Sequence, residues 1–309
     1  MIENGTPVAE SEISADDAVS MVDAVKRLFE ETRALVRVSD PMPSPGSIAD
    51  QELRSFPMPR CLLEAYAQGT FLIEVTADQL MALARALDDP VLTIAPWSCT
   101  RSLLEPGARS CRLLDPTASA HERVRRSLAL RYKGLEQQRT WGRSRYGGEF
   151  EKWIESKLVE VTDLATELGF DPILNEGKRS GAGEQWVSAT DVVENSLGEA
   201  ANYRLLSAIN HGHVWALELG CFREVTPEGT TIDSVESILG GTRYRKHIEP
   251  GNVRFLCGLS GKTLLLALTS KGTLFGWQQN ILNAVARAVE DCSDEVRGML
   301  KADWTEWTA

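Results

Sequence analysis

An arginine and a histidine seven positions apart are the residues of this sequence whose spacing best suits chemistry. Arg204 and His211 lie in the segment YRLLSAINHG, whose apolar pattern predicts a helix. A helix turns about 100° per residue, so these two side chains share one face, about 10 Å apart along the axis. Tyr203 and Ser207 fall on or beside the same stripe. The pattern predicts a surface where a permanent cation, an imidazole and two hydroxyl groups meet.

A cation and an imidazole on one face make this stripe a candidate active surface. Histidine titrates near neutral pH and can serve as acid or base. The alternative is that His211 only caps its helix, because it directly precedes Gly212 at the negative end of the helix dipole.

A second charged stripe lies on the helix predicted over residues 95–115. Arg101, Glu105 and Arg109 follow one another at four-residue intervals. One interpretation is a row of intrahelical ion pairs, each worth about 0.2–0.5 kcal/mol. The other is that Arg101 and Glu105 point into the protein and orient the first stripe, since a buried arginine is seldom left without a carboxylate. All three residues are therefore candidates for binding a substrate.

The charge of the chain is distributed unevenly. A net charge of −11 argues against general nucleic-acid binding, which needs a basic surface. In the segment 123–145, however, eight basic residues stand against one glutamate, so this segment carries +7 and the rest of the chain −18. Arg126, Arg131 and Lys133 are therefore candidates for guiding a polyanion. The alternative is a solvated helix face whose cations pair with acidic neighbours.

Two short motifs resemble the HEPN superfamily, helical proteins of prokaryotic toxin and defence systems. They are TRSLLE (Thr100–Glu105) on an early helix and YRLLSAINHG (Tyr203–Gly212) on a later one, and the resemblance covers roughly residues 60–215. Many HEPN proteins are metal-independent ribonucleases with an arginine and a histidine separated by four to six residues. The pair in this sequence has six residues between its members, and Leu205 stands where the family more often has a polar residue.

The resemblance implies a protein that acts on RNA or a nucleotide, as an endoribonuclease of a defence or toxin system. Cleavage of RNA without a metal ion needs a base for the 2′-hydroxyl proton, an acid for the leaving 5′-oxygen and a cation beside the phosphorane. One Arg–His pair supplies half of these groups and a two-fold dimer would supply the rest, so the resemblance also implies a homodimer. It implies that Arg204 holds phosphate, that His211 is the acid or base, and that Ser207 and Tyr203 are auxiliary donors. Neither a metal nor another cofactor is expected.

Two other functions stay open. One is an all-α enzyme of small-molecule biosynthesis that binds a diphosphate through Arg101, Arg109 or the region of Arg131. Three polar residues at four-residue intervals are similar to the magnesium-binding face of terpene cyclases, although an exposed polar face explains them better: Asp191, Asn195 and Glu199. The other is a non-catalytic antitoxin or regulatory protein that binds a partner protein through the helix predicted over 14–38.

The elements that must position these residues are almost all helical. Residues 1–13 are expected to be disordered, and 14–48 to form an N-terminal helical arm and a proline-rich linker. An all-α bundle domain is predicted for 49–309, because strands do not alternate with helices as a parallel sheet requires. Its predicted parts include helices over 60–75, 77–88 (starting at Thr76), 95–115, 118–141, 149–168 and about 190–212, with a break at Gly147–Gly148 and a loop over 171–186. The remaining parts are a short helix among the turn residues of 223–249, a buried helix or a hairpin over 251–272, and a short amphipathic segment over 294–306.

Composition limits where the protein is expected to act. The chain is 43% apolar and 25% charged, which is ordinary for a globular protein. Without a run of roughly 20 uncharged apolar residues or a signal-like N-terminus, it is expected to be cytoplasmic and to contact no membrane. Six cysteines without close spacing predict reduced thiols in the core.

Overall fold

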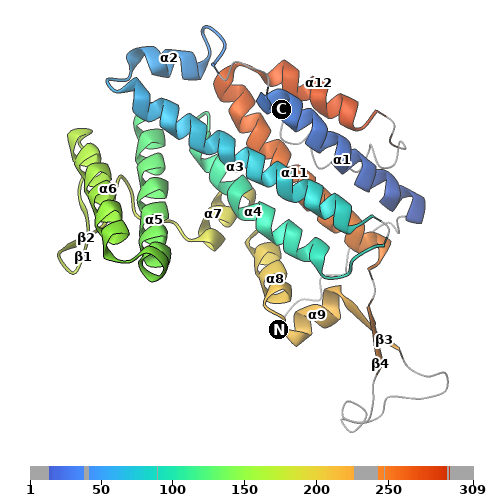
Figure 1. The fold of residues 1–309 in the computed structure, drawn as a ribbon. Coiled ribbons are helices and arrows are strands. Elements are labelled where there is room, and N and C mark those ends of the chain that lie inside the picture. Colours follow the sequence, from blue (N-terminus) through green and yellow to red (C-terminus); the bar gives the residue numbers. More distant parts are fainter. Residues whose placement is uncertain are drawn as a thin grey trace, which may run out of the picture.

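The computed structural model describes residues 14–37, 42–88, 90–225, 243–246, 248–290 and 292, and these form a helical bundle (Figure 1). The all-α fold class predicted from the sequence is confirmed. Strands in the described part of the chain are confined to two short antiparallel pairs. The short amphipathic segment predicted over 294–306 and most of 223–249 lie outside the described residues.

The centre of the bundle is built from long helices. These are α1 (Ala15–Arg37), α3 (Pro59–Ala86), α4 (Ala95–Leu113) and α11 (Pro250–Phe275), with α12 (Gln278–Ala288) beside α1 and α11. The apolar repeat of α1 buries Met21, Val25 and Leu28 in the common core. The helix predicted as an arm therefore packs against α3, α11 and α12 of its own chain.

Two boundaries in these long helices differ from the sequence predictions. A helix start predicted at Thr76 is wrong, because α3 runs unbroken through this position and the Thr76 hydroxyl donates to the carbonyl oxygen of Leu72 at 2.7 Å. The apolar segment over 251–272, left open as a helix or a hairpin, lies in α11. This is the one described helix long and apolar enough to span a membrane, but 61% of its apolar window is buried among other helices, as in the core helix of a bundle.

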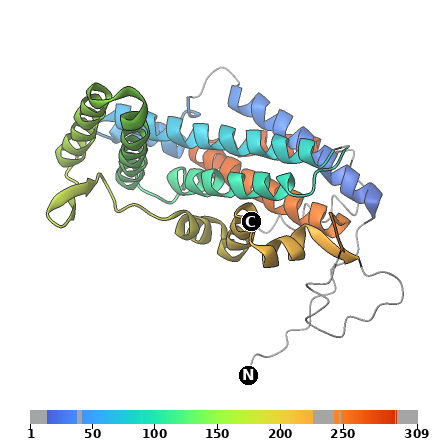
Figure 2. The ribbon, with the colours of Figure 1, turned by 60° about the horizontal axis from the view of Figure 1, so that its bottom comes forward.

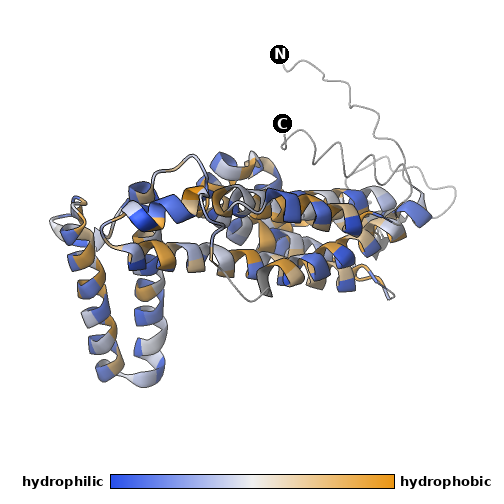
Figure 3. Cartoon of the chain, turned by 90° about the horizontal axis from the view of Figure 1, so that it is seen from above, coloured by the Kyte–Doolittle hydropathy of each residue, from blue (hydrophilic) through white to orange (hydrophobic). Residues whose placement is uncertain are grey.

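A helical hairpin projects from one end of the body. Helix α2 (Ile48–Ser55) leads into α3, and α5 (Ala120–Tyr146) starts near the same end with a capping box formed by Ser119 and Glu122. Gly147, with φ 75°, separates α5 from the antiparallel α6 (Gly148–Glu167). Figure 3 shows the two helices extending away from the other elements, with the turn at Gly147 at the free end.

The chain returns from this hairpin along α4. The segment predicted as a loop over 171–186 contains a hairpin of β1 (Ile173–Asn175) and β2 (Lys178–Gly181). The helix predicted over about 190–212 is wrong as one element, because it is divided into α7 (Ala189–Leu197) and α8 (Ala200–Asn210). Both pack on α4 (Figure 2). They are followed by α9 (Val214–Gly220) and by the paired strands β3 (Phe222–Val225) and β4 (Arg243–Lys246).

Candidate functional site

Helix α8 and its C-cap residue contain the four residues in which the sequence placed the chemistry. The helix follows Gly198, whose left-handed φ of 71° ends α7 and lets α8 take its own direction. Tyr203 is buried with 4% of its surface exposed, Ser207 is half-buried, and Arg204 and His211 are exposed. The predicted stripe is therefore divided into a packed part and a part open to solvent.

His211 occupies the C-terminal end of α8. Its backbone N–H donates to the carbonyl oxygen of Ser207 at 2.9 Å, and Gly212 follows with φ 73°. The imidazole lies 6.5 Å from that of His213, centroid to centroid, and forms no hydrogen bond with the residues that the structure describes. Arg204 likewise forms no ion pair within the described ranges. Both side chains are therefore open to a ligand.

Arg101 reaches from α4 to the packed part of the stripe. Its Nη2 donates to Tyr203 Oη at 2.6 Å and its Nε to Ser207 Oγ at 3.4 Å. The guanidinium carbon lies 4.8 Å from the centroid of the Tyr203 ring. Burial raises the pKa of Tyr203, so the phenol stays protonated at neutral pH. Arg101 thus points toward α8, as expected if it orients the α8 stripe. Within the part of the chain that the structure describes, it contacts Tyr203 and Ser207 but not the exposed Arg204 or His211.

Glu105 and Arg109 combine both interpretations of that stripe. Nε and Nη2 of Arg109 donate to the same oxygen of Glu105 at 3.0 and 2.9 Å, which makes an ion pair within α4. The Arg109 guanidinium also lies 4.1 Å from the ring centroid of Trp186 and donates to the Val187 carbonyl at 3.4 Å. The pair therefore fastens α4 to the segment that precedes α7.

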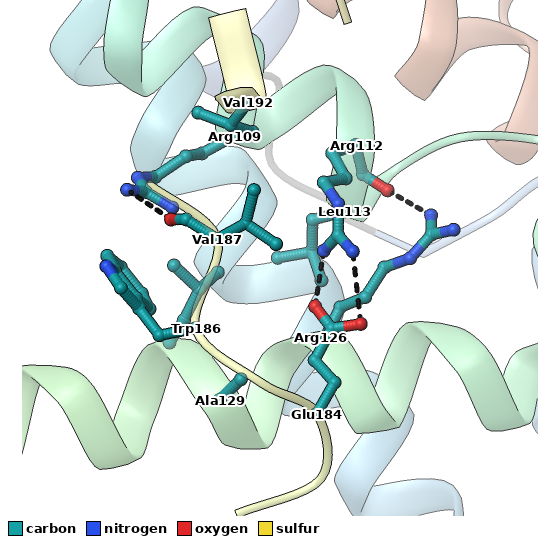
Figure 4. Close-up of a pocket in the computed structure, with 10 residues that line it drawn as sticks. Arg109, Arg112, Leu113, Arg126, Ala129, Glu184, Trp186, Val187 and Val192 are labelled. Atoms are coloured by element: carbon teal, nitrogen blue, oxygen red, sulfur yellow. Dashed lines mark hydrogen bonds and ion pairs between the residues drawn. The ribbon is translucent and has the colours of Figure 1, made fainter. Parts of the chain in front are cut away.

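Three arginines gather around a small cavity between α4, α5 and that segment (Figure 4). We call Arg109, Arg112 and Arg126 the arginine cluster. Arg112 binds the Glu184 carboxylate through both of its Nη atoms, with Nη2 at 3.0 Å from Oε2. Arg126 donates from Nη1 to the carbonyl oxygen of Arg112 at 2.6 Å. The cavity holds about 20 Å³, which is room for about one water molecule.

A larger groove of about 340 Å³ shares Arg112 and Arg126 with this cavity. The other residues that line it are Cys111, Asp115, Asn195, Ser196 and Ser270. The Nε of Arg126 is buried without a hydrogen-bond partner among the described residues. Burial, followed by the charge of Arg112, lowers the pKa of Arg126.

The predicted substrate-binding cations of the 123–145 segment have acidic partners. Arg131 binds Glu64 at 3.0 Å and Lys133 binds Glu136 at 3.0 Å. Arg126 lies 3.5 Å from a carboxylate oxygen of Glu122 and 3.7 Å from one of Asp115. In the first half of α5, the cations therefore pair with acidic neighbours, as the alternative interpretation of the basic segment expected. Toward the free end of α5, Arg143 and Arg145 are exposed.

The three polar residues compared with a magnesium-binding face do not lie on one helix. The shared helix face expected for them is therefore wrong. Gly198 separates α7 from α8, so Asp191 and Glu199 stand at the starts of different helices. Asp191 accepts a hydrogen bond from Ser188 Oγ at 2.6 Å, and Glu199 binds Lys262 at 2.9 Å. The described residues contain no cluster of three His, Cys, Asp or Glu side chains suited to a metal ion. None of the six cysteines, all within the described ranges, forms a disulfide.

Two glutamates that organise the arginines were missed by sequence reasoning. Glu184 binds Arg112, and Glu52 binds Arg123, across 72 and 71 positions of the chain. The only local signal for Glu184 is its place in the 171–186 segment, a length at which loops usually have a function. Glu52 has no local signal.

Comparison with known proteins gives no independent indication of function. No family model, curated protein or solved structure matches this chain. What the chain does must therefore be inferred from the chemistry of its own side chains.

Proposed function

We propose that this protein acts on RNA or a nucleotide, as a HEPN-like, metal-independent endoribonuclease whose active surface is the exposed side of α8. One observation carries the proposal: Arg101 reaches across to Tyr203 and Ser207 beside an exposed Arg204 and His211. A cation and a titratable group at one accessible surface are the minimum for phosphodiester cleavage without a metal.

The proposed roles follow from exposure and contact. Arg204 binds phosphate, because its guanidinium is exposed and has no acidic partner in the described part of the chain. His211 transfers the proton, since its imidazole is accessible at the end of α8. Tyr203 is buried, so it acts with Ser207 by positioning Arg101, which supplies a second cation on the α4 side.

A second copy of the chain would complete the site. One histidine cannot be acid and base in the same step, and a two-fold axis beside α8 would bring a second His211 opposite the first. The helix that follows His211 supports such an interface, because α9 exposes three large apolar side chains to solvent. They are Val214 at 68%, Trp215 at 58% and Leu219 at 69% exposed.

Cleavage of labelled RNA in the presence of EDTA tests this proposal. The wild-type protein should cleave, and His211→Ala should be about 100-fold slower or worse, because a positioned acid or base contributes roughly 10²–10⁴-fold. Arg204→Ala should also be slower. His121→Ala and Arg60→Ala are matched controls on exposed side chains of α5 and α3, and both should cleave as the wild type does. Intact RNA with the wild type, or full activity in His211→Ala, would show the proposal to be wrong.

A second candidate function is the binding of a small phosphorylated molecule in the groove at Arg112 and Arg126. Two guanidinium groups line this groove, and about 340 Å³ lies within the usual range of roughly 300–1,000 Å³ for ligand sites. Calorimetric titration with inorganic pyrophosphate tests it. Binding should be lost in Arg126→Leu and kept in Arg60→Leu, whereas equal binding by both variants would exclude this groove.

A further inference from the structure

The free end of the α5–α6 hairpin carries four aromatic side chains in one cluster. We call Trp141, Tyr146, Phe150 and Trp153 the aromatic tip. Ring centroids lie 5.4 Å apart for Trp141 and Tyr146, 5.4 Å for Tyr146 and Phe150, and 5.6 Å for Phe150 and Trp153. Trp141, Tyr146 and Trp153 are 56%, 56% and 51% exposed. Because the hairpin extends away from the body, this apolar surface faces solvent (Figure 3).

One ring of the aromatic tip is packed closely against the backbone of α5. Phe150 of α6 lies directly on the backbone of Gly142 in α5, where an added Cβ would be only 1.9 Å from the ring. Only glycine at this position lets the ring lie so close. The partly buried Phe150 ring then contacts those of Trp141 and Trp153, with centroids 6.4 and 5.6 Å away. The exposed rings are therefore held in a fixed arrangement.

Cations surround the aromatic tip. Arg143, Arg145 and Lys152 are exposed, and the Arg145 guanidinium lies 6.0 Å from the Tyr146 ring centroid. Arg143 is 74% exposed and only 3.7 Å from Glu151, an ion pair of the kind that contributes little in water. These positive charges are available to an anionic ligand, unlike the paired cations nearer the body.

We infer that the aromatic tip binds single-stranded RNA. Exposed rings accept the faces of successive bases whatever their sequence, and neighbouring arginines bind the phosphates between them. Arg143 and Arg145 lie in the last turn of α5, close to the rings in the chain, which suits a strand that stacks its bases and binds through its phosphates. Glu149 and Glu151 at the start of α6 would repel phosphate groups, so the phosphates are expected beside Arg143 and Arg145 in the last turn of α5. The class of ligand rests on the proposed function, and the tip would hold a strand whose other part lies at α8.

Binding is measured by fluorescence anisotropy with a labelled single-stranded RNA of about 20 nucleotides, in a His211→Ala background that prevents cleavage. Trp141→Ala with Trp153→Ala should weaken binding about 10-fold or more, because each stacked base contributes roughly 5–150-fold. Arg143→Glu with Arg145→Glu leaves the apolar packing intact, so it remains informative if the first pair of changes unfolds the hairpin. It should weaken binding and make it less dependent on salt.

The matched controls are Phe71→Ala and Arg60→Ala, which change an aromatic side chain 64% exposed and an arginine side chain 90% exposed on α3. Both should bind RNA as the parent does. Equal binding by parent and tip variants would overturn the inference. So would loss of binding to phosphatidylserine vesicles in the tip variants with RNA binding unchanged, because the tip would then be a membrane contact.

Cleavage of a trinucleotide by otherwise wild-type protein separates the two proposals. This substrate offers few nucleotides beyond the bond that is cut, so its cleavage should not depend on the tip, and the tip variants should cleave it at the wild-type rate. RNA binding that depends on the tip in a protein that never cleaves would refute the proposed function alone. Cleavage together with tip-independent binding would refute this inference alone.

Discussion

Removing the carboxylate of Glu52 should be among the most damaging single changes in this fold. Its partner Arg123 has no exposed surface, and all of its donors are used. Nε and Nη2 of Arg123 donate to the two Glu52 oxygens at 3.2 Å each. The remaining donors bind carbonyl oxygens at the end of α4 and in the turn that follows, those of Leu113, Asp115 and Ala118. Tyr66 donates its hydroxyl to the same carboxylate.

Glu52→Ala leaves a guanidinium buried without a counter-ion and a phenol without an acceptor. Breaking a buried pair from one side typically costs about 3–5 kcal/mol. Glu52→Gln keeps an acceptor oxygen but loses the charge, so it should cost about 1–3 kcal/mol. Since a domain is stable by only about 5–15 kcal/mol, Glu52→Ala should still fold but with a large part of its stability gone.

Urea unfolding followed by circular dichroism measures these differences. Glu160→Ala is the matched control, because it removes one partner of an exposed ion pair with Lys157 and should change the free energy of unfolding by less than about 1 kcal/mol. If Glu52→Ala costs no more than this control, the buried ion pair does not hold α2, α4 and α5 together, and the reasoning is wrong.

Two further predictions concern a buried lysine and a glycine with positive φ. Burial lowers the pKa of Lys271 to about 8 from 10.5, so the unfolded chain binds more protons than the folded one between these values. The free energy of unfolding should then rise by about 2–3 kcal/mol over that range relative to Lys271→Met, and a pH-independent difference between the two in urea unfolding would contradict this. At Gly183 (φ 73°) an added Cβ would lie 2.2 Å from the carbonyl oxygen of Arg125, whereas at Gly169 (φ 78°) it would meet nothing within 4 Å. Gly183→Ala should therefore lower the free energy of unfolding in urea by about 1–3 kcal/mol more than Gly169→Ala does, and equal losses in the two variants would contradict this prediction.

Local sequence patterns predicted the helices well and their interruptions less well. The apolar repeat of α1 and the Gly147–Gly148 break between α5 and α6 needed only neighbouring residues, and both are confirmed. Gly198 was missed because a single glycine is tolerated inside a helix, and its left-handed φ depends on how α7 and α8 each pack on α4. The helix start predicted at Thr76 failed for a related reason. The Thr76 hydroxyl donates to the Leu72 carbonyl oxygen within a continuous helix and does not cap a new one.

The candidate site was predictable in its residue types but not in its pairings. The sequence indicated a face with Arg204 and His211, and the structure leaves both exposed. That Arg101 would bind Tyr203 and Ser207 depended on how α4 packs on α8, about 100 positions later in the chain. The basic segment looked like one surface because the carboxylates that neutralise its first half come from other elements.

The chemical groups at the ends of the cut RNA show whether His211 activates the 2′-hydroxyl without a metal ion. RNA incubated with wild-type protein in EDTA should carry 2′,3′-cyclic phosphate and 5′-hydroxyl ends, identified by mass spectrometry, because the proposed site activates the 2′-hydroxyl with His211 and needs no metal ion. These ends should be missing with His211→Ala. RNA that stays intact, or that is cut only with Mg²⁺ to leave 5′-phosphate ends, would contradict the account.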